Sequence, residues 1–235
     1  MGCTPERSER GREQIAPAFP LSAHRPCYDK FMENGVNFFK ILAAALAAYL
    51  LGAIPTALIY SRAAHSADIR TLGDGNLGAR NIKRNFGWRA GVLVALVDIV
   101  KGALAVWLSI LLSMPEFWHY TCGALAILGH DFPVFARFKG GQGFAVTTGV
   151  FLGLFPVLTL IGAFLYAAIY FTTRSSDLGA SVGMGFLAAA QWLTGGSLAS
   201  ILYIVLVLLF VPFKKWLDRP RREQIEQNAG SRPSM

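Results

Sequence analysis

Charged residues are scarce in this chain of 235 residues. Only 15% are Asp, Glu, Lys or Arg, whereas 54% are hydrophobic and the mean hydropathy is +0.44. About a quarter of the residues in a typical soluble domain are charged, so this scarcity excludes that class and indicates a polytopic membrane protein. Acidic residues are the rarer sign, with 14 against 22 basic residues. The basic residues stand between and after apolar runs, which indicates loops facing anionic lipid and not a nucleic-acid partner.

Cysteine and internal repetition are also nearly missing. The three cysteines, Cys3, Cys27 and Cys122, show neither the spacing of a metal site nor a disulfide framework. No internal repeat is visible, and the polar motifs gather at one predicted membrane face. Transporters often contain repeats with a site near the membrane midplane, so this pattern disfavours transport.

The first 35 residues are polar and lack the apolar core of a signal peptide. We expect residues 1–35 to form a disordered leader, and we interpret Met32 as the true start of the protein. The membrane domain is expected over residues 36–215, and a basic cytoplasmic tail over residues 216–235. Peptides from upstream of Met32 in the purified protein would contradict the proposed start.

Long apolar runs predict an all-α protein with about seven transmembrane helices. A membrane helix needs roughly 20 apolar residues, so two of the runs are long enough to cross twice. The first is expected to break near Pro156, and the second to turn at Thr194, Gly195, Gly196 and Ser197. The expected spans lie within residues 41–61, 90–113, 117–136, 140–173 and 178–213.

Basic residues decide the predicted orientation. Residues 61–89 carry six Lys or Arg residues, and further basic residues follow the third span and the last one. Cytoplasmic loops are enriched in Lys and Arg, so seven crossings with the N-terminus outside put every basic segment in the cytoplasm. Six crossings would leave the basic tail outside. The short first half of the double crossing at residues 140–173 is alternatively a re-entrant segment.

A glycine- and asparagine-rich loop at residues 68–89 is the first candidate site. Gly73, Gly75 and Gly78 are expected to let backbone N–H groups approach a ligand, because glycine tolerates positive φ. Backbone donors combined with guanidinium groups form a phosphate site. The glycine spacing also fits a dinucleotide fingerprint, but no βαβ unit surrounds it. The basic residues around these glycines are Arg70, Arg80, Lys83, Arg84 and Arg89.

A second glycine-rich loop follows His130. Lys139 precedes Gly140, Gly141 and Gly143 at a predicted helix entrance, an arrangement that suits an anion, although these glycines also serve a simple turn. Asp98 and Lys101 lie three residues apart within a span. Ionisable residues in a span usually face protein or water, so this pair is either functional or a structural ion pair.

Together these residues resemble the acyl-phosphate:glycerol-3-phosphate acyltransferases of the PlsY type. The family pattern D-I-R-x-x-G-S-G-N-x-G-A-T-N-x-x-R matches most of residues 68–84, including Asn76, Asn81 and Arg84. Its D-x-x-K-G matches residues 98–102, and its G-H-x-F-P and F-K-G-G-K-G match residues 129–133 and 138–143 except at Gln142. The similarity covers about residues 52–225.

The resemblance implies a membrane enzyme with its site at the cytoplasmic face. Members transfer an acyl group from acyl phosphate to the sn-1 hydroxyl of glycerol 3-phosphate, forming lysophosphatidic acid without metal or coenzyme A. By similarity, the catalytic residues are Asn76, Arg84, Lys139 and His130. The residues implied in substrate and phosphate binding are Arg70, Gly73, Gly75, Gly78, Asn81, Lys101, Gly140, Gly141 and Gly143.

The chain departs from the family pattern where the family handles phosphate. Asp74 replaces a serine, Arg80 a threonine and Gln142 a lysine, while Asp177 and Arg221 replace a serine and a histidine. A carboxylate about 4 Å from a phosphate would cost roughly 4 kcal/mol at an effective dielectric constant of 20. We expect Arg80 to compensate Asp74. The alternatives are a divergent relative with another acyl donor or acceptor, and a non-catalytic lipid-binding or transport protein.

Overall fold

Helices make up the regular structure of residues 26–230, the part of the chain that the computed structural model describes. The chain divides into two units, residues 1–39 and 40–235. The described part of the first unit is the beginning of α1 (Pro26–Ala53), and the second unit holds every other element. The predicted all-helical fold is confirmed for this part of the chain.

Helix α1 begins inside the segment that we expected to be a disordered leader. It starts at Pro26, whose fixed φ suits the first position of a helix. Residues 26–35 are thus helical backbone, while residues 1–25 of the predicted leader lie outside the described part. The start at Met32 stays a prediction.

The remaining elements follow in order without a strand among the described residues. They are α2 (Thr56–His65), η1 (Ile69–Thr71), α3 (Ala79–Phe86), α4 (Trp88–Leu111), α5 (Glu116–Asp131), η2 (Val134–Ala136), α6 (Phe144–Leu154), α7 (Pro156–Thr173), α8 (Ser176–Leu193), α9 (Leu198–Leu217) and α10 (Arg219–Gly230).

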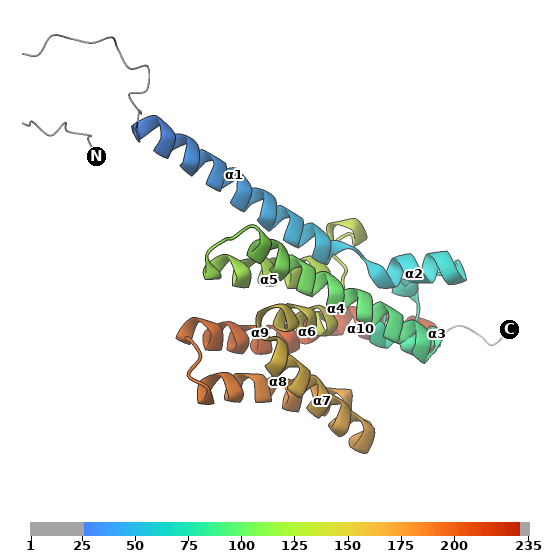
Figure 1. Cartoon of the computed structure of the whole chain (residues 1–235). Coiled ribbons are helices and arrows are strands. Elements are labelled where there is room, and N and C mark those ends of the chain that lie inside the picture. The colour runs from blue at the N-terminus through green and yellow to red at the C-terminus, as the bar shows by residue number, and fades with distance from the viewer. Residues whose placement is uncertain (1–25, 231–235) are drawn as a thin grey trace, which may run out of the picture. The chain divides into compact units, whose positions relative to one another are not determined.

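Both predicted breaks in the long apolar runs are confirmed. Helix α6 ends at Leu154 and α7 begins at Pro156, where the missing N–H of proline costs nothing in the first turn. Helix α8 ends at Leu193 and α9 begins at Leu198, on either side of a turn in which Gly195 has a φ of +74°. Helices α7 and α8 lie between these two breaks, and Figure 1 shows them side by side as an antiparallel pair.

The first expected span is bent. Residues 37–53 of α1 and helix α2 meet at 41° across Ile54 and Pro55, and they qualify as a membrane span only as a pair. Proline removes a backbone donor and interrupts the helical ladder, which accounts for the break.

Three described helices are long and apolar enough to cross a membrane by themselves. They are α4, α7 and the stretch from Leu198 to Ile225, which contains α9. Helix α6 is apolar but has only 11 residues, and α5 has only 16 residues, or about 24 Å at 1.5 Å per residue. Large apolar side chains remain exposed on the helices, including Leu111 of α4 and Leu193 of α8, each 82% exposed.

Glycines allow α4 and α6 to pack closely. A Cβ atom built on Gly149 of α6 would lie 1.9 Å from the carbonyl oxygen of Ile99, and one on Gly102 of α4 would lie 2.3 Å from that of Val146. Small residues let helix backbones approach in membranes, where hydrophobic burial alone does not drive association. This contact fixes α4 and α6, the helices that follow the first and the second glycine-rich loop.

Replacing Gly149 with alanine should therefore destabilise the protein by about 1–3 kcal/mol or more, because a backbone oxygen has to move. Thermal unfolding in detergent measures the effect. Gly185→Ala is the matched control, since a Cβ atom there meets nothing within 4 Å and alanine favours the helix. Equal melting temperatures for the two variants would contradict the close α4–α6 contact.

Candidate functional site

Asp68 opens the first loop and holds two arginines. Its carboxylate caps η1 by accepting from the backbone N–H of Arg70 at 3.0 Å, and it pairs with the side chains of Arg70 and Arg62 at 2.5 and 3.0 Å. These hydrogen bonds, above all those from the Arg70 side chain, hold the pKa of Asp68 well below its usual value. Arg70, predicted to bind phosphate, is thus engaged by a carboxylate.

Asn81 ties the loop together from the first turn of α3. Its fully buried side-chain amide donates to the backbone carbonyls of Ile69, Leu72 and Asn76 at 3.3, 3.0 and 3.1 Å. Its oxygen accepts from Asn85 at 3.0 Å. Asn81 therefore supports the predicted phosphate loop, because its side-chain amide donates its hydrogen bonds to the backbone of that loop.

The conformations of the three loop glycines differ. Gly73 and Gly75 have φ values of +56° and +65°, as predicted. Gly78 has a φ of −111°, so the expectation of positive φ is wrong at this position. It stands in extended backbone as the residue preceding α3, and a Cβ atom there would find its nearest neighbour at 3.6 Å. At Gly73, by contrast, a Cβ atom would lie 2.3 Å from the Asn81 oxygen.

Asp74 lies in the centre of this loop, only 3% exposed. One carboxylate oxygen accepts from the backbone N–H of Asn76 at 3.2 Å. The other faces Arg84 at 3.6 Å and Arg222 of α10 at 3.4 Å. The expected pair between Asp74 and Arg80 is therefore wrong, because these two other guanidinium groups lie beside the carboxylate.

Arg80 points to a different carboxylate. It lies 2.8 Å from Asp177 at the start of α8, and Lys215 of α9 lies 2.7 Å from the other oxygen of the same carboxylate. Arg80 also donates to Ser176. The two unusual charges at positions 80 and 177 thus compensate each other across a gap of 97 residues.

The second loop lies against the first. The N–H of Leu77 donates to the carbonyl of Gly140 at 3.4 Å. Gly140 is enclosed, since a Cβ atom there would lie 2.2 Å from the carbonyl oxygen of His130. The two glycine-rich loops predicted to share a face are therefore adjacent, and Asn76, Arg84 and Gly140 belong to one region.

Lys139 projects from a strained turn in this second loop. It is exposed, and the two residues before it, Arg137 and Phe138, have φ values of +57° and +59°. Positive φ is a marked outlier for a bulky side chain, and such strain often marks functional positions. The turn thus places Lys139 outside the helices, next to Gly140.

His130 and Lys101 belong to a separate buried cluster. Lys101 lies 2.9 Å from Asp98 and donates at 2.9 Å to the carbonyl of Ile54, at the bend between α1 and α2. The Nδ1 of His130 lies 3.8 Å from Asp98. The ring packs on Gly141, where a Cβ atom would lie 2.1 Å from Nε2. The structure thus brings these residues under the second loop, away from the guanidinium groups that face Asp74.

Asp131 adjoins this cluster. It is fully buried, and neither carboxylate oxygen has a hydrogen-bond partner among the described residues. Both oxygens face Gly143, which has a φ of +70° and precedes the N-terminus of α6. Asp131 thus lies beside the start of α6 without capping that helix by a hydrogen bond.

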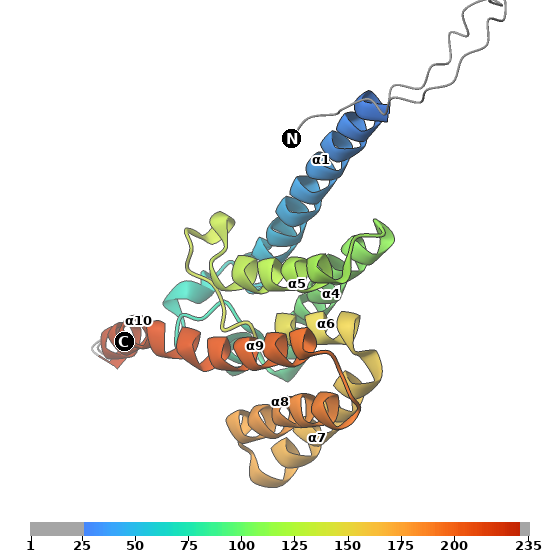
Figure 2. The ribbon, with the colours of Figure 1, turned by 90° about the vertical axis from the view of Figure 1, so that its left-hand side faces the viewer.

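Helix α10 supplies two residues that sequence reasoning left out of the site. Arg221 donates to the carbonyl of Gly75 at 2.5 Å, and Arg222 faces Asp74. Burial lowers the pKa of Arg221 from its usual value. In Figure 2, α10 lies at the end of the second unit that carries the first loop. The basic residues of the tail were the signal in the sequence that pointed to these two arginines. The sequence did not show that the tail folds back onto the first loop.

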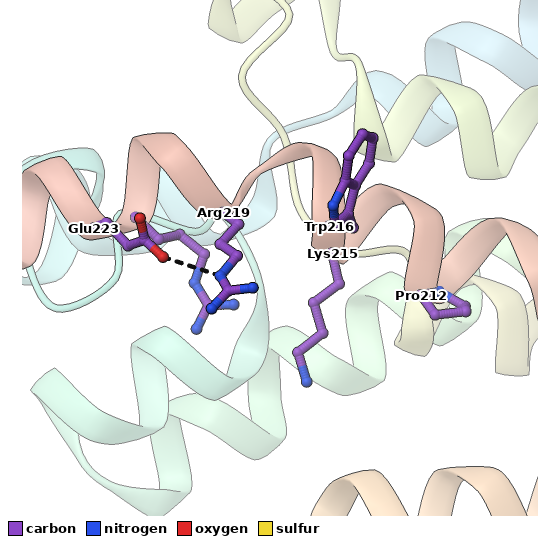
Figure 3. A pocket seen from close by; sticks show the side chains of 6 residues that line it. Pro212, Lys215, Trp216, Arg219 and Glu223 are labelled. Atoms are coloured by element: carbon purple, nitrogen blue, oxygen red, sulfur yellow. Dashed lines mark hydrogen bonds and ion pairs between the residues drawn. The ribbon is translucent and has the colours of Figure 1, made fainter.

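A cavity of about 400 Å³ opens beside this region, at the junction of α9 and α10 (Figure 3). It is rich in basic side chains, and Arg219 pairs with Glu223 at 2.9 Å along its wall. Its lining residues are Pro212, Lys215, Trp216, Arg219, Arg222 and Glu223. Since Arg222 also faces Asp74, the cavity borders the first loop.

Comparison with known proteins gives a consistent result. The family described as glycerol-3-phosphate acyltransferase matches residues 42–222. Glycerol-3-phosphate acyltransferase 1 of Rhizobium johnstonii is 36% identical over 168 residues, covering 72% of this chain and 81% of that protein. The Agrobacterium fabrum glycerol-3-phosphate acyltransferase is 39% identical over 170 residues, covering 71% and 80%.

A solved structure is also similar. It is the glycerol 3-phosphate form of PlsY (YgiH), an integral membrane glycerol 3-phosphate acyltransferase, with a TM-score of 0.70 and 25% sequence identity. The match covers 77% of this chain and 90% of that chain.

The support role of Asn81 predicts an order of stability among its variants. Asn81→Ala leaves three carbonyls without their donor and should cost about 1–3 kcal/mol. Asn81→Asp, although isosteric, should cost more, because a carboxylate would face those carbonyl oxygens. Thermal unfolding gives the order, and limited proteolysis within residues 69–78 reports loop opening. A stability of Asn81→Asp equal to wild type would contradict this role.

Proposed function

The chain belongs to the glycerol-3-phosphate acyltransferase family, and from this membership we propose that it transfers a fatty acyl group from acyl phosphate to the sn-1 hydroxyl of glycerol 3-phosphate. The products are lysophosphatidic acid and phosphate. The protein is a membrane acyltransferase, and the resemblance noted in its motifs is confirmed by a family match over residues 42–222.

The observation that best supports this proposal is the junction of the two loops at Leu77 and Gly140. It gathers Arg84, Arg221 and Arg222 with the exposed Lys139 around glycine-rich backbone. Both proposed substrates carry phosphate groups, so cations and backbone donors are needed to bring them together against their mutual repulsion.

The reaction requires no protein nucleophile in this proposal. The sn-1 oxygen attacks the acyl carbon, the bond between that carbon and the phosphate oxygen breaks, and the phosphate leaves with the bonding electrons. The hydroxyl proton passes to the departing phosphate. Positioning and charge stabilisation carry the catalysis, with Arg84 and Lys139 neutralising phosphate charge and Asn76 orienting a substrate oxygen. His130 is the fourth proposed catalytic residue, and its ring packs against Gly141 of the second loop.

We place the protein in the bacterial inner membrane with the site facing the cytoplasm. Seven short helices with the N-terminus outside put the loops and the basic tail on one side, in accord with the enrichment of Lys and Arg in cytoplasmic segments. The contacts of α10 with Gly75 and Asp74 support this arrangement, because they require the tail and the first loop to share a face.

A divergent relative with another acyl donor or acceptor is the second candidate. The buried carboxylate of Asp74 favours it, because an anion within the loop opposes phosphate binding. This second candidate predicts that the protein acylates another acceptor with a higher kcat/KM than glycerol 3-phosphate.

The proposed function predicts that purified protein releases phosphate and forms lysophosphatidic acid from acyl phosphate and glycerol 3-phosphate. Arg84→Ala and Lys139→Ala should each lower kcat/KM about 10–100-fold, since a hydrogen bond to a charged group contributes about 1.5–3 kcal/mol. Both products are quantified in proteoliposomes.

Arg89→Ala is the charge-matched control, because its guanidinium lies over the ring of Trp88 at the surface. Its kcat/KM should match that of wild type. Phosphate release without lysophosphatidic acid would indicate hydrolysis of the donor or a different acceptor. Turnover that is unaffected by either loop substitution would place the active site elsewhere.

A further inference from the structure

Asp74 supplies an anion to the centre of a site that is otherwise suited to bind one. Its carboxylate faces Arg84 from α3 and Arg222 from α10, while Arg221 contacts the carbonyl next to it along the loop. The carboxylate therefore stands where two guanidinium groups from distant parts of the chain converge. It links the first loop to α10.

The contacts of this carboxylate with the arginines are loose. The distances of 3.6 and 3.4 Å exceed the usual 2.7–2.9 Å of a charge-assisted hydrogen bond. The Nε of Arg222 is buried and has no hydrogen-bond partner among the described residues. Buried polar groups are normally hydrogen-bonded, so this unused donor indicates a site that the carboxylate fills incompletely.

A phosphate monoester suits these two guanidinium groups better than a carboxylate does. It has three terminal oxygens and close to two negative charges, and each guanidinium can donate two parallel hydrogen bonds to it. A singly charged anion of the same shape offers the guanidinium groups only about half of that charge. Asp74 is attached to the loop, so its effective concentration at the arginines is high, and a free ligand of equal charge competes poorly.

We propose that Asp74 is an internal ligand of the phosphate site, holding Arg84 and Arg222 until the phosphate group of the acceptor takes its place. In this way Asp74 sets the affinity of the site: every anion that uses these arginines must displace the carboxylate, and its binding is weakened by the same factor. The proposal rests on the proposed use of this loop for glycerol 3-phosphate. It adds a role for a residue that otherwise only opposes binding.

Glycerol 3-phosphate and glycerol 3-sulfate test this role, because they have nearly the same shape but carry about two charges and one charge at pH 8. Their binding to the full-length protein in detergent is measured by calorimetry without acyl donor. Asp74→Asn removes the charge and keeps an oxygen for the N–H of Asn76. It should bind both ligands at least tenfold more tightly and by a similar factor, because both displace the same carboxylate in the wild-type protein.

Glu116→Gln is the matched control, because it removes one negative charge at the start of α5, where Glu116 pairs with Tyr120. It should bind both ligands as wild type does. Asp74→Ser repeats the test with a smaller residue in case Asp74→Asn is unstable. Failure of both variants to fold would overturn the proposal, because a ligand that phosphate displaces cannot be required for folding.

Affinities that are unchanged or lower in folded Asp74→Asn would also overturn it, and would make Asp74 a structural residue of the loop. The acyltransfer assay separates this outcome from a failure of the proposed function. Tighter binding of both ligands without lysophosphatidic acid formation in any variant would support the role of Asp74 while contradicting the proposed reaction.

Discussion

The side-chain amide of Asn81 is the interaction on which the site depends. Three backbone carbonyls of the first loop converge on it, so the loop has one arrangement as long as this amide is in place. That arrangement buries Asp74 and turns Leu77 toward Gly140, which joins the two glycine-rich loops. A buried carbonyl without a donor is costly, so one amide that serves three carbonyls makes this irregular backbone stable.

Ion pairs then connect this loop to the helices that follow. Asp74 meets Arg222 of α10, and Asp177 of α8 meets both Arg80 of α3 and Lys215 of α9. The positions at which the chain departs from its family pattern are thus largely partners of one another or of nearby basic residues. The charge of Asp74, at a position where the family pattern has serine, is placed between two guanidinium groups.

The features that could be predicted from sequence are those that a short segment determines. The breaks before Pro156 and after Leu193 and the positive φ of Gly73 and Gly75 follow from local backbone chemistry. The glycine-rich loops were also recognisable as a pair, since each combines glycines with basic residues and matches a family motif. Gly78 shows the limit of this reasoning, because glycine is compatible with extended backbone as well.

The partners of the charged residues could not be predicted in the same way. Arg80 was assigned to Asp74 because both lie in one loop, yet its partner Asp177 is 97 residues away. Long flexible side chains reach whichever carboxylate the packing of helices brings near, and that packing is set by contacts such as Gly149 against Ile99. The contribution of Arg221 and Arg222 depends likewise on α10 returning to the loop, which no local pattern in the tail specifies.

The balance of charge at the two loops stays basic despite this pairing, as the proposed use of the site for phosphate requires. Arg80, Arg84, Lys215, Arg221 and Arg222 surround two carboxylates, those of Asp74 and Asp177, and Lys139 adds a further cation from the second loop. The basic residues remain in excess after each carboxylate is paired. An excess of cations held partly by internal anions stays ordered without substrate and still attracts a phosphate, because the dianion offers more charge and more acceptor oxygens than the carboxylate it meets.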